Sequence, residues 1–281
     1  MTAVTGRPFF RVSILAIMLF QVCALFTRSA LDLFFVSIGS DRSVAEDLSY
    51  LVVPPVLVAL SYPYLRRNKQ ALASLFKPCQ LTLRLCCLSL LLGFLMRVTY
   101  WATLTVLMWM GLLKNDDPGA IVGPVLGFSC PPLLALCLSF FVMAFLVPIV
   151  EEVINRGFLL HALLPKGIVV ALGVSACLFA VVHRLDSYPV AFIVGLFLGV
   201  QALNSRTLWA PVLAHAAYNA TAILDWDCFQ IVWNPPETDP GLAALTRVAA
   251  PIAILGTLIC CLLVSKKAIG ARLPRSPVLA A

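Results

Sequence analysis

The stretch from 133 to 164, LLALCLSFFVMAFLVPIVEEVINRGFLLHALL, decides the fold of this chain. No charged residue interrupts it before Glu151. A helix needs about 20 mostly apolar residues to cross the hydrocarbon core of a bilayer, and this stretch is longer. We therefore expect one long membrane-spanning helix, which begins after Pro131-Pro132 and ends before Pro165.

The composition of the whole chain agrees with a membrane protein. Hydrophobic residues make up 61% of the 281 residues and charged residues only 12%, and the mean hydropathy is +0.98. Soluble domains are about 25% charged, so this chain cannot cover an ordinary water-facing surface. A soluble enzyme, a disordered chain, a collagen and a nucleic-acid-binding protein are therefore excluded. The net charge of +7 comes from basic residues in short loops, which set membrane orientation.

Seven further apolar runs predict an all-α, polytopic membrane helix bundle of about eight transmembrane helices in a single integral membrane domain, 1–281. The expected helices cover 12–38, 48–65, 81–113, 133–164, 167–183, 189–203, 208–224 and 247–265. Pro54-Pro55 should bend the second helix, because proline removes a backbone donor. In the first helix, Arg28 and Asp32 are four residues apart and can form a pair.

The charges of the loops predict the orientation. The segments 66–77 and 266–275 are basic, whereas 41–47, 114–117 and 225–239 are mostly acidic. Basic loops stay on the cytoplasmic side, so both termini are expected there. We expect the protein to interact with the lipid bilayer and not with nucleic acid. The brevity of the chain favours a bacterial plasma membrane, and the oligomeric state stays open.

Ten cysteines raise the question of disulfides. The chain has no C-x-x-C motif, and a cysteine in an apolar helix usually behaves as a small hydrophobic residue. We therefore interpret the cysteines inside or beside apolar runs as packing residues: Cys23, Cys86, Cys87, Cys130, Cys137, Cys177, Cys260 and Cys261.

The charged residues inside the long helix need an explanation, because a charge at the bilayer centre costs about 2.5–3.5 kcal/mol on insertion scales. Glu152 and Arg156 are four residues apart and can form an ion pair along the helix. Glu151 is rotated by about 100° from Glu152, so its carboxylate faces elsewhere. We assign the pair to support and Glu151 to chemistry. The alternative is a helix that ends in interfacial water, but the apolar continuation 157–164 argues against it.

Two of the three histidines have a companion at helical spacing. Phe179 precedes His183 by four residues, and Asn219 follows His215 by four. His161 has no such companion and is given a structural role. A single histidine in a membrane helix is most often structural. Two histidines together with an amide and a buried carboxylate in one small chain argue for a functional site. At about 1.5 Å per residue from the nearest helix end, their depths overlap, so a shared intramembrane site is possible.

Three motifs occur in a fixed order on separate apolar segments: E-E-x-x-x-R at 151–156, F-x-x-x-H at 179–183 and H-x-x-x-N at 215–219. Together they resemble the signature of the CPBP (CAAX protease and bacteriocin-processing, or Abi) intramembrane proteases, a group that includes the type II CAAX prenyl endopeptidases. The resemblance predicts a catalytic core at about 133–225 and accessory helices at 12–113 and 247–265.

The resemblance implies a role for each motif residue. Glu151 corresponds to the catalytic glutamate, and His183 to the histidine that helps it to activate water. His215 and Asn219 correspond to the pair that stabilises the oxyanion. Glu152, Arg156 and Phe179 are supporting residues. Members of the family process prenylated proteins, bacteriocin leaders or signalling peptides, so the expected substrate is a membrane-associated protein or peptide whose identity stays open.

The chemistry also permits a metal. Peptide hydrolysis needs an activated water, a proton acceptor and donors for the oxyanion. Glu151, His183 and His215 are also a set that can hold Zn²⁺ with an open fourth position. The chain lacks H-E-x-x-H, which would favour zinc. The cofactor is therefore either none or Zn²⁺, with a slight preference for a metal-free glutamate base.

Two other functions compete with a protease. In a transporter or channel, Glu151, Glu152, Arg97 and the histidines would form an ion path. The chain shows no inverted repeat, which is common in secondary transporters. In a non-catalytic scaffold or immunity protein, the polar cluster would serve helix packing alone. A Glu151→Gln variant separates these functions, because only the protease hypothesis predicts loss of cleavage.

Overall fold

In the computed structural model, the described residues are 12–40, 42–109, 130–183, 187–224, 251–252 and 254–259. All regular elements in these ranges are helical. The α-helices are α1 (Ile14–Ser37), α2 (Arg42–Arg67), α3 (Lys69–Leu75), α4 (Leu83–Trp109), α5 (Leu133–Ser139), α6 (Val147–Glu152), α7 (His161–Leu163), α8 (Ile168–Val181), α9 (Tyr188–Ser205) and α10 (Trp209–Ile223).

The predicted all-α membrane bundle is confirmed, whereas the number of spans is not. Five of the described helices are long and apolar enough to cross a membrane: Ile14–Ser37, Leu48–Arg67, Leu83–Tyr100, Leu133–Lys166 and Tyr188–Ser205. The helix Ile168–Val181 is apolar but shorter. The prediction of a helix at 247–265 falls mostly outside the described residues.

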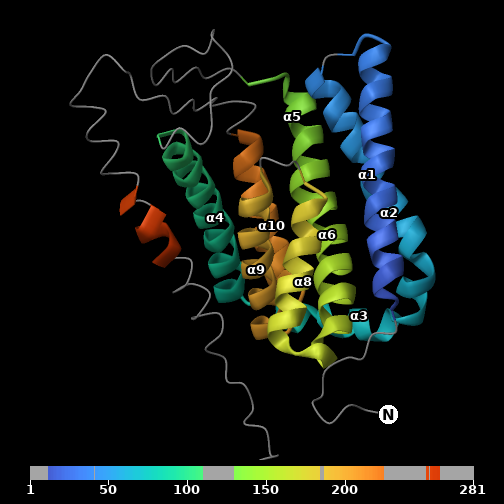
Figure 1. Ribbon diagram of the computed structural model, residues 1–281, viewed down its shortest axis with the longest axis vertical. Coiled ribbons are helices and arrows are strands. Elements are labelled where there is room, and N and C mark those ends of the chain that lie inside the picture. The colour runs from blue at the N-terminus through green and yellow to red at the C-terminus, as the bar shows by residue number, and fades with distance from the viewer. Residues whose placement is uncertain are drawn as a thin grey trace, which may run out of the picture.

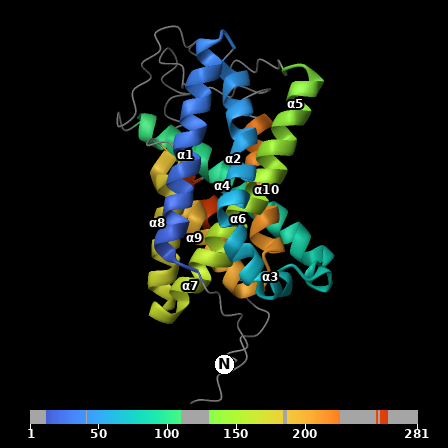
Figure 2. The ribbon, with the colours of Figure 1, turned by 90° about the vertical axis from the view of Figure 1, so that its right-hand side faces the viewer.

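The helices pack in neighbouring pairs. Figure 1 shows α1 and α2 on one side of the bundle and α4 on the other, with the long helix that includes α5 and α6 between them. Helix α1 packs on α2, α8 on α9, and α4 on α10. In Figures 1 and 2, α3 and α7 lie at one end of the bundle, and α5 begins at the opposite end. The long central helix thus connects the two ends.

This central helix follows the predicted path but has two wide turns that the sequence did not predict. The π-helical segments η2 (Phe140–Leu146) and η3 (Val153–Leu160) flank α6. Pro148 lies at the start of α6 and cannot donate a backbone hydrogen bond, which disturbs the regular ladder. Such wide turns are frequent at functional sites. Here they surround Glu151 and Glu152.

A glycine allows the close packing of α4 on α10. A Cβ atom added to Gly93 would lie 2.1 Å from the carbonyl oxygen of Ala214 and 2.7 Å from the Cβ of Ala217. Neither contact is possible for a real side chain, so only glycine fits here. This contact places α4 directly against the helix that carries His215 and Asn219.

One sequence prediction needs correction. Cys130 is disulfide-bonded, so it is not only a packing residue, although Cys23, Cys86, Cys87, Cys137 and Cys177 are free, as expected. The predicted pairing of Arg28 with Asp32 stays a prediction. Among the described residues, the Oδ1 atom of Asp32 has no hydrogen-bond partner, and the Arg28 guanidinium lies 3.7 Å from the centre of the Tyr50 ring.

Candidate active site

The ion pair predicted from helical spacing is present and completely buried. Arg156 donates to Oε1 of Glu152 at 3.0 Å, and both side chains are 0% exposed. Arg156 also donates to the carbonyl oxygen of Gly195 in α9 at 3.1 Å. Its guanidinium lies 4.4 Å from the centre of the Phe179 ring in α8. The pair therefore connects the central helix to α8 and α9.

Glu152 also fixes the imidazole of His215. The Nδ1 atom of His215 lies 2.9 Å from the same Oε1 atom of Glu152. A carboxylate paired with an arginine accepts hydrogen bonds, so Nδ1 carries the proton. The other ring nitrogen, Nε2, lies 3.9 Å from Oε2 of Glu151. His215 therefore lies between two carboxylates, one supporting and one open to the cavity.

Glu151 differs from its neighbour in exposure and in partners. Its side chain is 18% exposed, and its Oε2 atom has no hydrogen-bond partner in the described part of the chain. A water oxygen that is about 2.8 Å from both Oε2 of Glu151 and Nε2 of His215 satisfies normal hydrogen-bond lengths. The geometry thus suits a water bridged between these two groups.

His183 lies just beyond the C-terminal end of α8 and bonds back to it. Its Nδ1 atom lies 2.7 Å from the carbonyl oxygen of Phe179, and the two rings are 4.7 Å apart. A carbonyl only accepts, so Nδ1 donates, and the Nε2 atom of a neutral His183 is an acceptor. The Phe179 ring also meets His215 edge-on at 5.7 Å. Phe179 thus touches both imidazoles.

The predicted partnership of Glu151 with His183 differs from the observed geometry. Among the described histidines, it is His215 that comes within 4 Å of the Glu151 carboxylate. The ring of His183 is held by the Phe179 carbonyl, so it faces the same cavity without touching the carboxylate. Both histidines of the motifs line the cavity. Which of them lies beside Glu151 depends on how the helices pack, and the motifs do not contain this information.

Asn219 lies one helical turn beyond His215 and is partly engaged. Its Nδ2 atom donates to the carbonyl oxygen of Met143 at 2.7 Å. Met143 belongs to the wide turn η2, where the backbone ladder is disturbed. An amide nitrogen has two hydrogens, so one N–H of Asn219 stays available. The residue therefore both anchors α10 to the central helix and offers a donor to the cavity.

Sequence reasoning missed a buried amide chain behind Glu151. Gln21 in α1 donates to Oδ1 of Asn155 at 2.7 Å, and Asn155 donates to the carbonyl oxygen of Glu151 at 2.9 Å. Gln21 and Asn155 are 7% and 2% exposed. Two features of the sequence could have indicated this chain of amides. Asn155 follows Glu151 by four residues, and Gln21 is an amide inside an apolar run.

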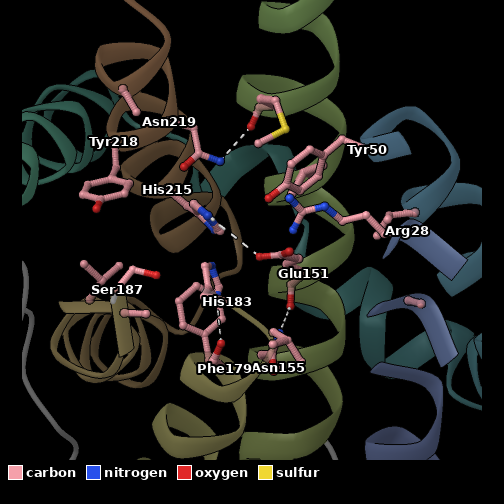
Figure 3. Close-up of a pocket in the computed structure, with 18 of the residues that line it drawn as sticks. Arg28, Tyr50, Glu151, Asn155, Phe179, His183, Ser187, His215, Tyr218 and Asn219 are labelled. Atoms are coloured by element: carbon pink, nitrogen blue, oxygen red, sulfur yellow. Dashed lines mark hydrogen bonds and ion pairs between the residues drawn. The ribbon is translucent and has the colours of Figure 1, made fainter. Parts of the chain in front are cut away.

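These side chains surround one cavity of about 520 Å³. It is lined by all four predicted catalytic residues, Glu151, His183, His215 and Asn219 (Figure 3). Glu151 lies near the middle of the 34-residue span Leu133–Lys166, so the cavity lies inside the membrane-spanning bundle. The helices α1, α2 and α4 add residues that the motifs did not place there, such as Arg28, Tyr50 and Arg97.

The residues predicted as metal ligands do not converge. In the described ranges, no group of three His, Cys, Asp or Glu side chains is arranged to hold a metal ion. Glu151 and His215 approach each other, but Nδ1 of His183 is occupied by a carbonyl and its ring does not complete the set. As placed, these residues do not fit a three-ligand zinc site.

Comparison with known proteins supports the motif assignment. Residues 133–221 match the model of the family described as type II CAAX prenyl endopeptidase Rce1-like. The match confirms the resemblance drawn from the three motifs and supports a membrane-embedded protease. No curated protein and no solved structure matches the chain.

Proposed function

We propose that this protein is an intramembrane endopeptidase that hydrolyses a peptide bond in a membrane-associated protein or peptide by means of a glutamate-activated water. One observation carries the proposal. A carboxylate oxygen of Glu151 that has no hydrogen-bond partner among the described residues lies 3.9 Å from Nε2 of His215, in a cavity near the middle of the membrane span. The family match at 133–221 supports the same reaction class.

The reaction begins with the water between Glu151 and His215. Glu151 takes one proton from this water, and the oxygen attacks the carbonyl carbon of the substrate. The carbonyl double bond opens to give a tetrahedral oxyanion. The protonated Glu151 then gives its proton to the leaving nitrogen, and the C–N bond breaks. The products are a new carboxyl terminus and a new amine.

Two groups are positioned to stabilise the oxyanion. The second N–H of Asn219 faces the cavity, and His215 becomes a donor through Nε2 when this atom is protonated. His183 contributes an acceptor, Nε2, which suits the second hydrogen of the attacking water or the substrate N–H. The Glu152–Arg156 pair holds His215 in place and does not take part in bond breaking.

The substrate class follows from the family description and from the location of the cavity. A prenylated peptide is the first candidate, because the matched family is described as a prenyl endopeptidase. A peptide with a lipid group or a hydrophobic segment can reach a cavity inside the bilayer, whereas a soluble protein cannot. We also propose that the reaction needs no metal ion. A measurement of the zinc content of the active protein tests this.

The test compares Glu151→Gln with a matched control, Asp32→Asn. Both changes remove one intramembrane carboxylate, but Asp32 is not among the residues that line the cavity. Purified wild-type protein and Asp32→Asn should cleave a prenylated probe peptide in vesicles, and Glu151→Gln should lose at least about 10³-fold in kcat, as expected for removal of a general base. Residual cleavage by a folded Glu151→Gln variant at the wild-type rate would refute the proposal.

A further inference from the structure

The exposed lysines and arginines in the described part of the chain all lie at one end of the bundle. They end α2, flank α3, begin α4 and follow α7 and α9: Arg66, Arg67, Lys69, Lys77, Arg84, Lys166 and Arg206. Figures 1 and 2 show α3 and α7 at this end. The backbone bond from Leu208 to the carbonyl oxygen of Leu75, at 2.9 Å, brings the start of α10 there as well. We call these cationic residues the basic face, and no acidic side chain of the described ranges lies among them.

The inner side of α3 fixes this helix to the bundle. Leu75 is 5% exposed, and its carbonyl oxygen accepts hydrogen bonds from the backbone N–H of Leu208 and from the hydroxyl of Thr207, each at 2.9 Å. Leu72 faces the central helix, where it lies 3.3 Å from the position that a Cβ atom on Gly157 would take. The exposed cations at both ends of α3 are therefore held in a fixed place.

Exposed apolar side chains lie directly beside these cations. Leu83, which precedes Arg84, is 82% exposed, and Val169, which follows Lys166 by three residues, is 79% exposed. Such pairs are typical of a helix that enters a bilayer, because the apolar side chain contacts acyl chains while the cation reaches the headgroup layer. The rings of Phe76 and Trp209 meet edge-on at this end, 5.2 Å apart, and tryptophan is enriched at the same depth of a membrane. The basic face therefore lies at the level of the lipid headgroups.

Anionic phospholipids carry the charge that complements this face. A negative membrane surface attracts basic residues close to it, and clusters of about four to eight lysines and arginines beside membrane-spanning helices are typical of anionic-lipid binding. We propose that the basic face binds the headgroups of anionic phospholipids, and that the bound headgroups stabilise the contact of α3 with the start of α10. None of its residues lines the cavity, so the proposal does not depend on the proposed protease.

The test measures which lipids associate with the purified full-length protein in vesicles. Spin-labelled phosphatidylglycerol, which is anionic, and spin-labelled phosphatidylcholine, which is zwitterionic, are added in turn, and the fraction of each label that the protein immobilises is measured. Wild-type protein should associate with phosphatidylglycerol at least about fivefold more strongly, which is the effect of about one basic residue at a charged membrane surface. It should also unfold at a higher temperature in phosphatidylglycerol vesicles than in phosphatidylcholine vesicles, because a ligand of the folded state stabilises that state.

The neutralised variant removes the charges around α3 by the changes Arg66→Gln, Arg67→Gln, Lys69→Gln and Lys77→Gln. It should lose most of the lipid preference and of the difference in unfolding temperature. The matched control keeps every charge by the changes Arg66→Lys, Arg67→Lys, Lys69→Arg and Lys77→Arg, and it should behave like wild-type protein. A second measurement needs no variant: in about 0.5 M NaCl the preference of wild-type protein should also fall, because salt screens exposed charges.

Equal association of the two lipids with wild-type protein would overturn the proposal. A preference that persists unchanged in the neutralised variant or in high salt would do the same, as would equal unfolding temperatures in the two kinds of vesicle. Binding of a soluble polyglutamate peptide to the protein in phosphatidylcholine vesicles, without any lipid preference, would assign the basic face to an acidic protein partner instead.

Discussion

At Glu151 and Glu152, one step of helical rotation separates the proposed catalytic carboxylate from a structural one. Glu152 is 0% exposed and is bound by Arg156 and His215, whereas Glu151 is 18% exposed and faces the cavity. Removal of either member of the buried pair would leave an uncompensated buried charge, which is strongly destabilising. The proposed role of Glu151 therefore depends in part on Glu152 and Arg156, which do not line the cavity.

The amide chain behind Glu151 gives a prediction for a residue far from the family motifs. Gln21→Leu removes the bond to Asn155 and leaves a buried acceptor unsatisfied, which costs about 1–3 kcal/mol of stability. Because Asn155 holds the Glu151 carbonyl, we also expect kcat to fall about tenfold or more, since small misplacements of catalytic groups reduce rates strongly. Peptide cleavage in vesicles and thermal unfolding measure the two effects.

The matched control is Gln201→Leu. Gln201 is equally buried and donates to Oγ of Ser89 at 2.8 Å, away from the cavity. The Gln201→Leu variant should lose about as much stability as Gln21→Leu but keep the wild-type kcat. Equal loss of kcat in both variants would show that Gln21 acts on stability alone.

At the scale of the helix, local spacing predicted some contacts, whereas others depend on packing. The Glu152–Arg156 pair follows from a separation of four residues and was predictable. The bond between His215 and Glu152 joins residues 63 positions apart, and the bond between Gln21 and Asn155 joins residues 134 apart. No periodic pattern contains such partners. The wide turns η2 and η3 were also missed, because an apolar run does not reveal its hydrogen-bond ladder.

The contact of α4 with α10 gives a prediction at this scale. Gly93→Ala places a methyl group 2.1 Å from the carbonyl oxygen of Ala214, so α10 must move away and carry His215 and Asn219 with it. Overpacking of this kind costs about 1–3 kcal/mol, and we expect kcat to fall with it. Gly173→Ala is the control, because no atom lies within 4 Å of the added Cβ. Full activity of a folded Gly93→Ala variant would show that this close contact does not position α10.

For the whole molecule, composition alone predicted a helical membrane bundle, because 12% charged residues cannot form a soluble surface. The arrangement around one cavity was predictable only in part. The motifs identified residues from the core, while Arg28, Tyr50 and Arg97 enter from helices that lie outside the matched range 133–221. Helix packing in a membrane depends on shape and small residues rather than on hydrophobic pattern, which explains this limit.

The orientation of the bundle is a prediction that two features support. Lys69 and Lys166 lie at the end that contains α3 and α7, and basic residues favour the cytoplasmic side. Cys130, next to the start of α5 at the opposite end, is disulfide-bonded, and disulfides form in oxidising compartments. An impermeant maleimide should label Ser37→Cys, but not Lys166→Cys, in intact cells. Labelling of the protein without an added cysteine serves as the background. Labelling of Lys166→Cys but not of Ser37→Cys would show that the orientation is the opposite of the predicted one.

The central claim is that Glu151 activates a water that attacks the peptide bond directly. A single turnover in H₂¹⁸O, with enzyme in excess over a prenylated probe peptide, tests it by mass spectrometry of both product and enzyme. We expect one ¹⁸O atom in the new carboxyl group of the product and none in the peptide that contains Glu151. Label in the Glu151 side chain, with an unlabelled product from the first turnover, would reveal a covalent acyl intermediate and contradict the account.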